Sequence, residues 1–305
     1  MISIVIPAYN EAGNITVIAR QVSKQAGKIG LYEIIFVDDG STDSTLEEIK
    51  TVAKNNSSVK YLSFSKNFGH QKALKAGLDY ASGDCVISMD ADLQHPPELI
   101  NELINKWQEG YDVVYTIRKD IRSVGFLKKT TSRIFYKLIN KISDVDIPMG
   151  VADFRLLDKK VVDELRKFKE NFLFIRGIVS WLGYKQTGIE YEVQDRYAGS
   201  TKYTLRKMIS FAIQGITSFS TAPLRVSIIV GFIVSAAAFF YTILALYARL
   251  FLQTVIPGWT SILISVLFLG GIQLISLGLI GEYLGKMFIE TKNRPNYVIK
   301  EKKLS

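Results

Sequence analysis

Short apolar runs and amphipathic segments alternate along the first third of the chain. The apolar runs predict buried strands, and the segments between them have the periodicity of helices. Strands are expected at 2–6, 32–37, 59–64 and 86–89, with helices that end near Ala26, begin at Thr42 or Asp43, and span 69–81. This alternation is typical of an α/β fold with a mostly parallel sheet, in which ligands bind beyond the carboxyl ends of the strands.

Two long uncharged runs, 226–248 and 250–281, dominate the C-terminal third of the chain. Each exceeds the about 20 residues that cross the hydrocarbon layer of a membrane, so they predict a hairpin of two transmembrane helices. Buried helices of a soluble protein would be shorter and would carry charges. The predicted organisation is a globular domain at 1–201, an amphipathic segment at 202–224, the hairpin at 225–285 with helices at about 226–250 and 259–281, and a basic tail at 286–305.

Basic residues lie before the first predicted span and after the second, and Arg249 alone lies at the turn between them. The positive-inside rule therefore predicts a multi-pass protein of the cytoplasmic membrane, with the globular domain and both termini in the cytoplasm. The uncharged start of the chain reads as a strand and not as a signal peptide. The single cysteine, Cys85, is expected inside a strand and indicates a reducing compartment.

A basic amphipathic helix is expected over 118–142. This stretch holds eight Lys or Arg residues and one acid, Asp120, and its basic positions recur every four residues beside an apolar face. Such a helix is suited to lie on an anionic membrane surface. A nucleic-acid-binding helix is an alternative that the two membrane spans argue against. A solvated surface helix stays open.

A pair of carboxylates follows the fourth predicted strand. Asp90 and Asp92 are two residues apart at a strand end, so their side chains point the same way and can face one cation. Carboxylates are hard oxygen ligands that suit Mg²⁺ or Mn²⁺, with substrate phosphates completing the coordination shell. A solvated turn is the alternative. Pro96-Pro97 is expected to open the next helix.

The region after the basic segment contains polar residues at predicted loop and helix-cap positions. Asp153 is expected in a loop, Asp158 is expected to cap a helix, and 190–194 alternates like a strand before a basic loop at 195–202. No Gly-x-Gly-x-x-Gly follows the first strand and no Walker loop occurs, so a dehydrogenase or a P-loop ATPase is disfavoured.

Five ordered motifs, at 4–11, 37–41, 90–94, 153–156 and 196–202, resemble glycosyltransferase family 2. Within it they look like the polyisoprenyl-phosphate glycosyltransferases, which include dolichol-phosphate mannose synthases and bactoprenol glucosyltransferases. The apolar segment 268–278 with Gly281-Glu282-Tyr283 is similar to the bactoprenol branch. The Gln-x-x-Arg-Trp motif of processive synthases has no match, because the segment 194–197 lacks both the spacing and the Trp.

The resemblance implies a GT-A-type, Rossmann-like domain and assigns roles to residues of this chain. It implies nucleotide binding by Pro7, Tyr9, Glu11, Asp39 and Ala91, metal and diphosphate binding by Asp90, Asp92 and Gln94, closure over the diphosphate by Arg196 and Lys202, and a catalytic position for Asp153 together with Asp90. Arg118 and Arg133 are our candidates for binding the acceptor phosphate, since each guanidinium group can form two parallel hydrogen bonds to phosphate oxygens. A general role of this pair in binding lipid headgroups stays open.

The expected reaction is the inverting transfer of a hexose from a nucleotide-diphosphate sugar to a polyisoprenyl phosphate, with UDP-glucose and undecaprenyl phosphate as the favoured substrates. The lipid phosphate is already largely ionised near neutral pH, so Asp153 is expected to position groups and not to take a proton, whereas the family resemblance implies a base. A structural, helix-capping role of Asp153 stays open. UDP-N-acetylglucosamine, UDP-galactose, a modified arabinose and GDP-mannose stay open as donors. The alternatives are a non-catalytic sugar-nucleotide-binding membrane protein and a flippase. Membrane lipids are expected partners, nucleic acid is not, and a homo-oligomer stays open.

Overall fold

The computed structural model describes residues 1–119, 151–192, 221–251 and 258–304. The chain divides into two units, the first of residues 1–212 and 294–305 and the second of residues 213–293. The described elements of the first unit are β1 (Ile2–Ala8), α1 (Ile15–Ala26), β2 (Tyr32–Asp38), α2 (Thr45–Asn55), β3 (Val59–Phe64), α3 (His70–Tyr80), β4 (Cys85–Ser88), α4 (Leu99–Gln108), β5 (Val113–Lys119), β6 (Val151–Asp158), α6 (Lys159–Lys167), α7 (Ile175–Trp181), β7 (Gln186–Glu192) and β8 (Ile299–Lys303).

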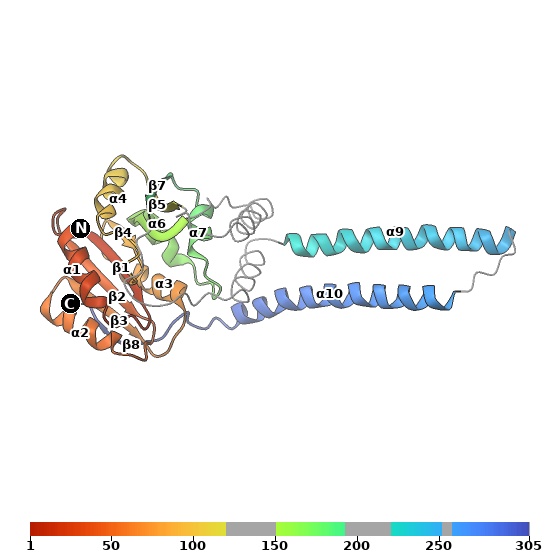
Figure 1. Cartoon of the computed structure of the whole chain (residues 1–305), viewed down its shortest axis with the longest axis horizontal. Helices are drawn as coiled ribbons and strands as arrows, with labels where there is room; N and C mark the ends of the chain where they lie inside the picture. Colours follow the sequence, from red (N-terminus) through yellow and green to blue (C-terminus); the bar gives the residue numbers. More distant parts are fainter. Residues whose placement is uncertain (120–150, 193–220, 252–257, 305) are drawn as a thin grey trace. The chain divides into compact units, whose positions relative to one another are not determined.

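Within the described part of the chain, eight strands form one mixed sheet in the order β7-β5-β6-β4-β1-β2-β3-β8 (Figure 1). The four strands predicted from the apolar runs, β1 to β4, run parallel to one another at its centre. β6 is antiparallel to both β4 and β5, and β8 is antiparallel to β3. The predicted α/β fold class is confirmed. The central strands are almost wholly apolar because helices cover both faces of the sheet.

Alternate side chains of β1 pack on opposite faces of the sheet. Ile4 and Ile6 are fully buried in the core that also contains the apolar faces of α1 and α4. Val5 faces α3, so closely that a Cβ added to Gly77 would come within 2.1 Å of its Cγ1. Burial of each such side chain contributes about 1.5–3 kcal/mol to folding.

Two predicted helix starts differ from the structure. The N-cap of α2 is Ser44, and Asp43 instead accepts a hydrogen bond from the backbone N–H of Thr45 at 3.0 Å. α4 begins at Leu99 and not at Pro96-Pro97. In both cases a turn precedes the helix. The residues of the turn are of the same polar and proline types that begin helices, so the sequence places the helix start too early.

The predicted start of the basic helix at 118 is wrong. Arg118 and Lys119 are the last residues of β5, which pairs with β6 and β7. The strand continues over these two residues because β7 pairs with them, Arg118 opposite Tyr191 and Lys119 opposite Glu192. The remainder of 118–142, and the segment 202–220, lie outside the described residues.

The second unit contains α9 (Ala222–Phe251) and α10 (Trp259–Thr291), two helices that lie side by side and antiparallel (Figure 1). Each contains a window long and apolar enough to cross a membrane, at Pro223–Tyr241 and Phe268–Thr291. Large apolar side chains on both helices are exposed, among them Phe232 and Ile275. The two predicted helices are confirmed as helices, and α10 runs ten residues beyond its predicted end at 281.

The end of the chain is not the simple basic tail that was expected over 286–305. Residues up to Thr291 belong to α10, and the residues from Arg294 onward belong to the first unit. Ile299–Lys303 form β8 at the edge of the sheet, antiparallel to β3. β3 would otherwise present a row of unpaired backbone groups to solvent, and β8 pairs with them.

Candidate active site

The predicted site residues gather at one edge of the sheet. The carboxyl ends of β1, β2, β3 and β4 share that edge because these strands are parallel. β6 is antiparallel to β4, with Arg155 opposite Ser88, so the beginning of β6 lies beside the end of β4. The same geometry brings the ends of β5 and β7 to this edge. The first part of the site surrounds Asp90, and the second is a pocket beyond β2 and β3.

Asp90 is held by two histidines. Its Oδ1 lies 2.9 Å from Nε2 of His70, the first residue of α3. Its backbone N–H donates to Nδ1 of the fully buried His95 at 3.2 Å. Nearby, Oδ1 of Asp92 accepts the backbone N–H of Gln94 at 3.2 Å, which orders the turn after the strand. Both carboxylates follow the end of β4 at Ser88, and their joint binding of one cation stays a prediction.

The charges of these groups are coupled. Burial raises the pKa of Asp90, but the hydrogen bond from His70 and the charges of both histidines outweigh it and lower that pKa. Partial loss of hydration lowers the pKa of His70, whose side chain is 43% exposed, but the bond to Asp90 and the charges of Asp90 and Asp153 raise it to about 9. Burial keeps the pKa of His95 below its ordinary value. At neutral pH this arrangement gives an Asp90 carboxylate paired with a protonated His70, beside a neutral His95.

A divalent cation would need ligands from the substrate at this site. Among the described residues, no group of three or more His, Cys, Asp and Glu side chains could hold a metal ion. Asp90 and Asp92 supply two hard carboxylates, and Mg²⁺ in nucleotide-dependent enzymes is commonly bound by one or two carboxylates plus phosphate oxygens. The residues present fit such a shared site and do not fit a cage made by the protein alone.

Asp153 lies inside β6, so its prediction as a loop residue is wrong. The pairing of β6 with β5 continues to Val151, opposite Ile117, and so extends the strand over Asp153. The backbone carbonyl of Asp153 also accepts the hydroxyl of Ser88 at 2.5 Å. Arg176 of α7 donates to both carboxylate oxygens, at 2.6 and 2.7 Å, and Arg155 lies 3.6 Å away. Burial raises the pKa of Asp153, but the charges of the two arginines and the bonds from Arg176 hold it well below the ordinary range.

Arg118 lies beside His95, one of the two histidines that contact Asp90. Its Nε donates to the hydroxyl of Tyr191 at the end of β7, at 3.2 Å, and its Nη2 lies 3.4 Å from Nε2 of His95. Arg133, Arg196 and Lys202 lie outside the described residues.

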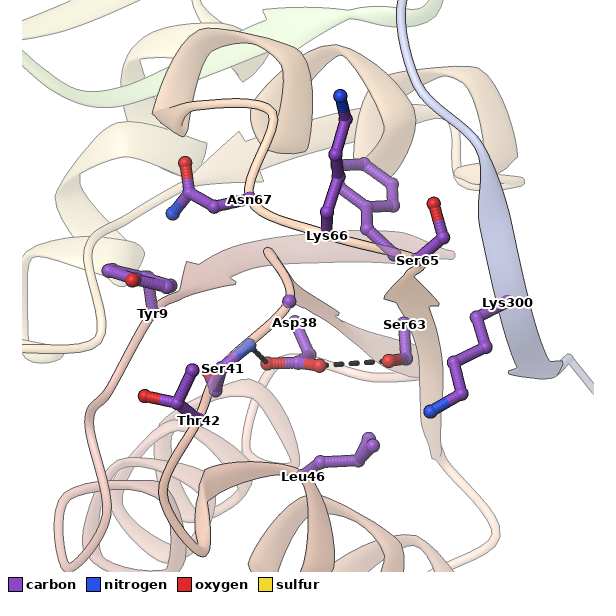
Figure 2. Close-up of a pocket in the computed structure, with 12 residues that line it drawn as sticks. Tyr9, Asp38, Ser41, Thr42, Leu46, Ser63, Ser65, Lys66, Asn67 and Lys300 are labelled. Atoms are coloured by element: carbon purple, nitrogen blue, oxygen red, sulfur yellow. Dashed lines mark hydrogen bonds between the residues drawn. The ribbon is translucent and has the colours of Figure 1, made fainter.

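A cavity of about 400 Å³ opens beyond β2 and β3 (Figure 2). Its size is within the range of small-ligand sites. It is lined by Tyr9, Asp38, Gly40, Ser41, Thr42, Leu46, Ser63, Phe64, Ser65, Lys66, Asn67 and Lys300. The Asp38 carboxylate accepts the backbone N–H of Ser41 at 3.0 Å and the hydroxyl of Ser63 at 2.8 Å, which ties the ends of β2 and β3 together.

Of the five residues that the resemblance assigned to the nucleotide, only Tyr9 lines this cavity. Pro7 is buried in β1 opposite Val37, and Ala91 is buried in the core. Glu11 accepts a hydrogen bond from the side chain of Asn14, 2.7 Å away.

Asp39 does not line the cavity but holds the loop that does. Its carboxylate accepts the backbone N–H groups of Phe68 at 2.7 Å and of Gly69 at 2.9 Å, and burial raises its pKa. It thereby fixes the loop after β3, whose first residues line the cavity.

Sequence reasoning missed His70, Arg176 and Lys300. His70 could have been found, since it opens the helix after a predicted strand and so falls at the ligand-binding edge. Arg176 is 23 residues from Asp153 in the chain, and Lys300 is far in the chain from the other residues that line the cavity, so no local pattern marks either of them.

Comparisons with known proteins agree with this architecture. The model of the family described as Glycosyl transferase family 2 matches residues 3–166. An uncharacterized glycosyltransferase, YkcC of Bacillus subtilis (strain 168), is 44% identical over 98% of this chain and 93% of its own. The bactoprenol glucosyl transferase of Shigella phage SfV is 45% identical over 99% of each chain. Among solved structures, glucosyl-3-phosphoglycerate synthase from Mycobacterium tuberculosis shares the fold, with a TM-score of 0.52 and 19% identity over 71% of this chain and 76% of that chain.

Proposed function

The chain belongs to glycosyltransferase family 2, and from this premise we propose that it transfers glucose from UDP-glucose to a polyisoprenyl phosphate, with undecaprenyl phosphate as the favoured acceptor. The observation that carries the proposal is the extent of the likeness to the phage bactoprenol glucosyl transferase. It covers 99% of both chains, and therefore includes the two apolar helices as well as the sheet. An acceptor with a polyprenyl tail is confined to the membrane, and a pair of apolar helices would hold the enzyme there.

The donor would lie along the carboxyl edge of the sheet. In this arrangement the nucleoside occupies the cavity beside Tyr9 and Asp38, and the diphosphate extends to Asp90 and Asp92. Asp90, Asp92 and Gln94 would hold Mg²⁺ or Mn²⁺ together with the diphosphate; the structural relative from M. tuberculosis was crystallised with Mn²⁺ and UDP. A bound divalent cation would stabilise the negative charge that develops on the leaving diphosphate. Arg196 and Lys202 are proposed to add donors to the same oxygens.

The reaction would be a direct displacement at the anomeric carbon. An oxygen of the lipid phosphate forms the new bond to C1 of glucose on the face opposite the leaving group, the bond from C1 to the diphosphate oxygen breaks, and UDP departs. The acceptor oxygen is already ionised, so no strong base is needed. Asp153 suits this scheme as a positioning residue, since its charge is stabilised by Arg176 and it has little tendency to take a proton. Arg118 and Arg133 are proposed to bind the acceptor phosphate.

We also propose that α9 and α10 cross the membrane as a hairpin and that the sheet unit lies in the cytoplasm. The basic residues on both sides of the hairpin support this orientation.

The proposal is tested with the full-length protein in phospholipid nanodiscs, given radiolabelled UDP-glucose, undecaprenyl phosphate and Mn²⁺ or Mg²⁺. We expect label in the lipid fraction that depends on the lipid phosphate and is lost with excess chelator. Asp92→Ala should abolish transfer without lowering Tm, because a strand-end carboxylate contributes little to stability. Asp163→Ala, an acid on α6 with a side chain 46% exposed, is the matched control and should keep full activity.

Parallel reactions with UDP-N-acetylglucosamine and UDP-galactose identify the sugar. Labelled lipid from one of these donors only would overturn the choice of glucose. Full activity of Asp92→Ala, or of the wild type in chelator, would remove the metal from the mechanism. Donor binding without any turnover would favour the non-catalytic alternative.

A further inference from the structure

Lys300 occupies an irregular position in β8. Ser63 of β3 pairs with Glu301, but the next residue, Phe64, pairs with Ile299, so the register shifts and Lys300 has no partner residue in the ladder. Such β-bulges change the direction of a side chain and are frequent beside functional sites. Here the side chain of Lys300 lines the cavity and reaches toward Ser63 and Leu46 (Figure 2).

The two residues of β8 that point to α2 are held there by their charges. Glu301 forms an ion pair with Lys50 at 3.0 Å, and Nζ of Lys303 donates to the carbonyl of Ala53 at 2.6 Å. Lys300 is exposed and, within the described part of the chain, forms no hydrogen bond or ion pair. Its ammonium group is therefore available to a ligand in the cavity.

The residues before β8 fix the strand to the wall of the same cavity. Tyr297 stacks on Phe64 with ring centroids 5.1 Å apart, and its hydroxyl donates to Asp79 at 2.9 Å. The backbone N–H of Ser65 donates to the carbonyl of Val298 at 3.0 Å. Phe64 and Ser65 both line the cavity, so the position of Lys300 is set by the residues that shape the pocket. These contacts fix the backbone of the strand, which presents Lys300 to the cavity from a defined position.

We infer that Lys300 is a donor-binding residue, which donates a hydrogen bond from its ammonium group to a carbonyl oxygen of the base or an oxygen of the ribose. This inference rests on the proposed function, because it takes the ligand of the cavity to be a nucleoside diphosphate. The cavity is lined by hydroxyl, amide and cationic groups, by the carboxylate of Asp38, and by the apolar Leu46 and Phe64. Asp90 and Asp92 do not line it. The nucleoside and not the diphosphate is therefore the part within reach of Lys300. The C-terminal strand, which follows the apolar hairpin in the sequence, thereby completes the donor pocket.

The test measures binding without acceptor or turnover. Full-length wild type and variants in nanodiscs are titrated with UMP and with UDP by calorimetry. Lys300→Met keeps the approximate length of the side chain and removes the charge. We expect this variant to raise the Kd for UMP and for UDP roughly tenfold to a hundredfold, as for the loss of a hydrogen bond to a charged group. Lys300→Arg, which keeps a cationic donor, should recover most of the affinity.

Lys302→Met is the matched control. Lys302 lies on the same strand, with Nζ 5.0 Å from the centre of the Tyr80 ring, and it does not line the cavity. This variant should bind both nucleotides within about twofold of wild type, because it removes the same charge from β8 outside the cavity. Equal melting temperatures of all variants would exclude unfolding as the cause of weaker binding.

The outcomes separate this inference from the proposed function. Wild-type affinity in Lys300→Met, or equal losses in Lys300→Met and Lys302→Met, would overturn the assignment. A loss with UDP but not with UMP would place Lys300 on the terminal phosphate and contradict its contact with the nucleoside. A wild type that binds UMP and UDP through Lys300 but transfers no sugar would refute the proposed function alone. Failure of the wild type to bind either nucleotide would overturn both.

Discussion

Gly40 occupies a backbone position that few other residues could fill. Its φ is +67°, and a Cβ at this position would lie 2.4 Å from the carbonyl carbon of Lys66 and 2.7 Å from the backbone nitrogen of Asn67. A left-handed conformation costs other residues about 1–2 kcal/mol. The collision adds to this cost, because it pushes on the loop that lines the cavity.

Gly40→Ala should therefore lower Tm and strongly weaken UMP binding, measured by thermal melting and calorimetry. Gly13→Ala is the control, since Gly13 has φ +86° but no atom within 4 Å of an added Cβ. It should show the conformational cost in Tm with an unchanged Kd for UMP. Equal UMP affinity in the two variants would show that the close approach of Gly40 to the loop does not shape the site.

The pair of Asp153 and Arg176 makes a pH-dependent contribution to stability. The pKa of Asp153 is lower in the folded chain than in the unfolded chain. Its contribution is therefore fully present above the ordinary carboxyl pKa near about 4 and is lost as the pH falls below that value. Arg176→Met leaves a buried carboxylate without its main partner, which typically costs about 3–5 kcal/mol. We expect a large loss of Tm at pH 7 that becomes smaller at about pH 3.5.

Asp153→Asn provides the control for this prediction. In that background the residue at 153 carries no charge, so the effect of Arg176→Met on Tm should be smaller and should not change with pH. A loss of Tm that is the same at both pH values in the native background would mean that Arg176 stabilises the fold by packing alone.

Among the elements, α6 shows a predicted cap that the structure confirms. Asp158 accepts the backbone N–H of Lys160 at 2.9 Å through one carboxylate oxygen and the indole N–H of Trp107 of α4 at 2.7 Å through the other. Asp158→Ala should reduce stability by about 1–2 kcal/mol from the cap, with a further loss from the unpaired indole, and so lower Tm by several degrees. Asp163→Ala in the same helix removes only an ion pair with Arg166 near the surface, and should change Tm by less than about a degree. Similar melting of both variants would contradict the capping role.

β8 is an element that local pattern does not predict. Ile299-Lys300-Glu301-Lys302-Lys303 has one apolar residue and four charges, a composition typical of a solvated tail. It becomes a strand because β3 is the edge of the sheet and because Tyr297 anchors the segment on Phe64. Charged residues are common in edge strands, since they discourage pairing with further chains.

For the whole molecule, the predicted hairpin is testable with cysteine labelling. The native Cys85 is buried, and burial raises the pKa of its thiol to about 12, so it should not react. Thr254→Cys, between the two apolar helices in the sequence, should react with a membrane-impermeant maleimide on intact cells. Glu109→Cys, at a side chain 52% exposed in the sheet unit, should react only after the cells are opened. Labelling of Glu109→Cys on intact cells would reverse the orientation.

Much of this protein was determined by local sequence. Four apolar runs specify the central parallel strands, two uncharged runs specify the long helices, and Asp90 and Asp92 lie at the strand end where they were expected, since each of these features depends on residues close together in the chain. The placement of Asp153 within a strand, the pairing of His70 with Asp90, and the entry of Lys300 into the cavity were decided only by the tertiary structure. Each depends on which strands become neighbours and in which register, and that choice follows from the packing of the whole sheet, which no short segment of sequence contains.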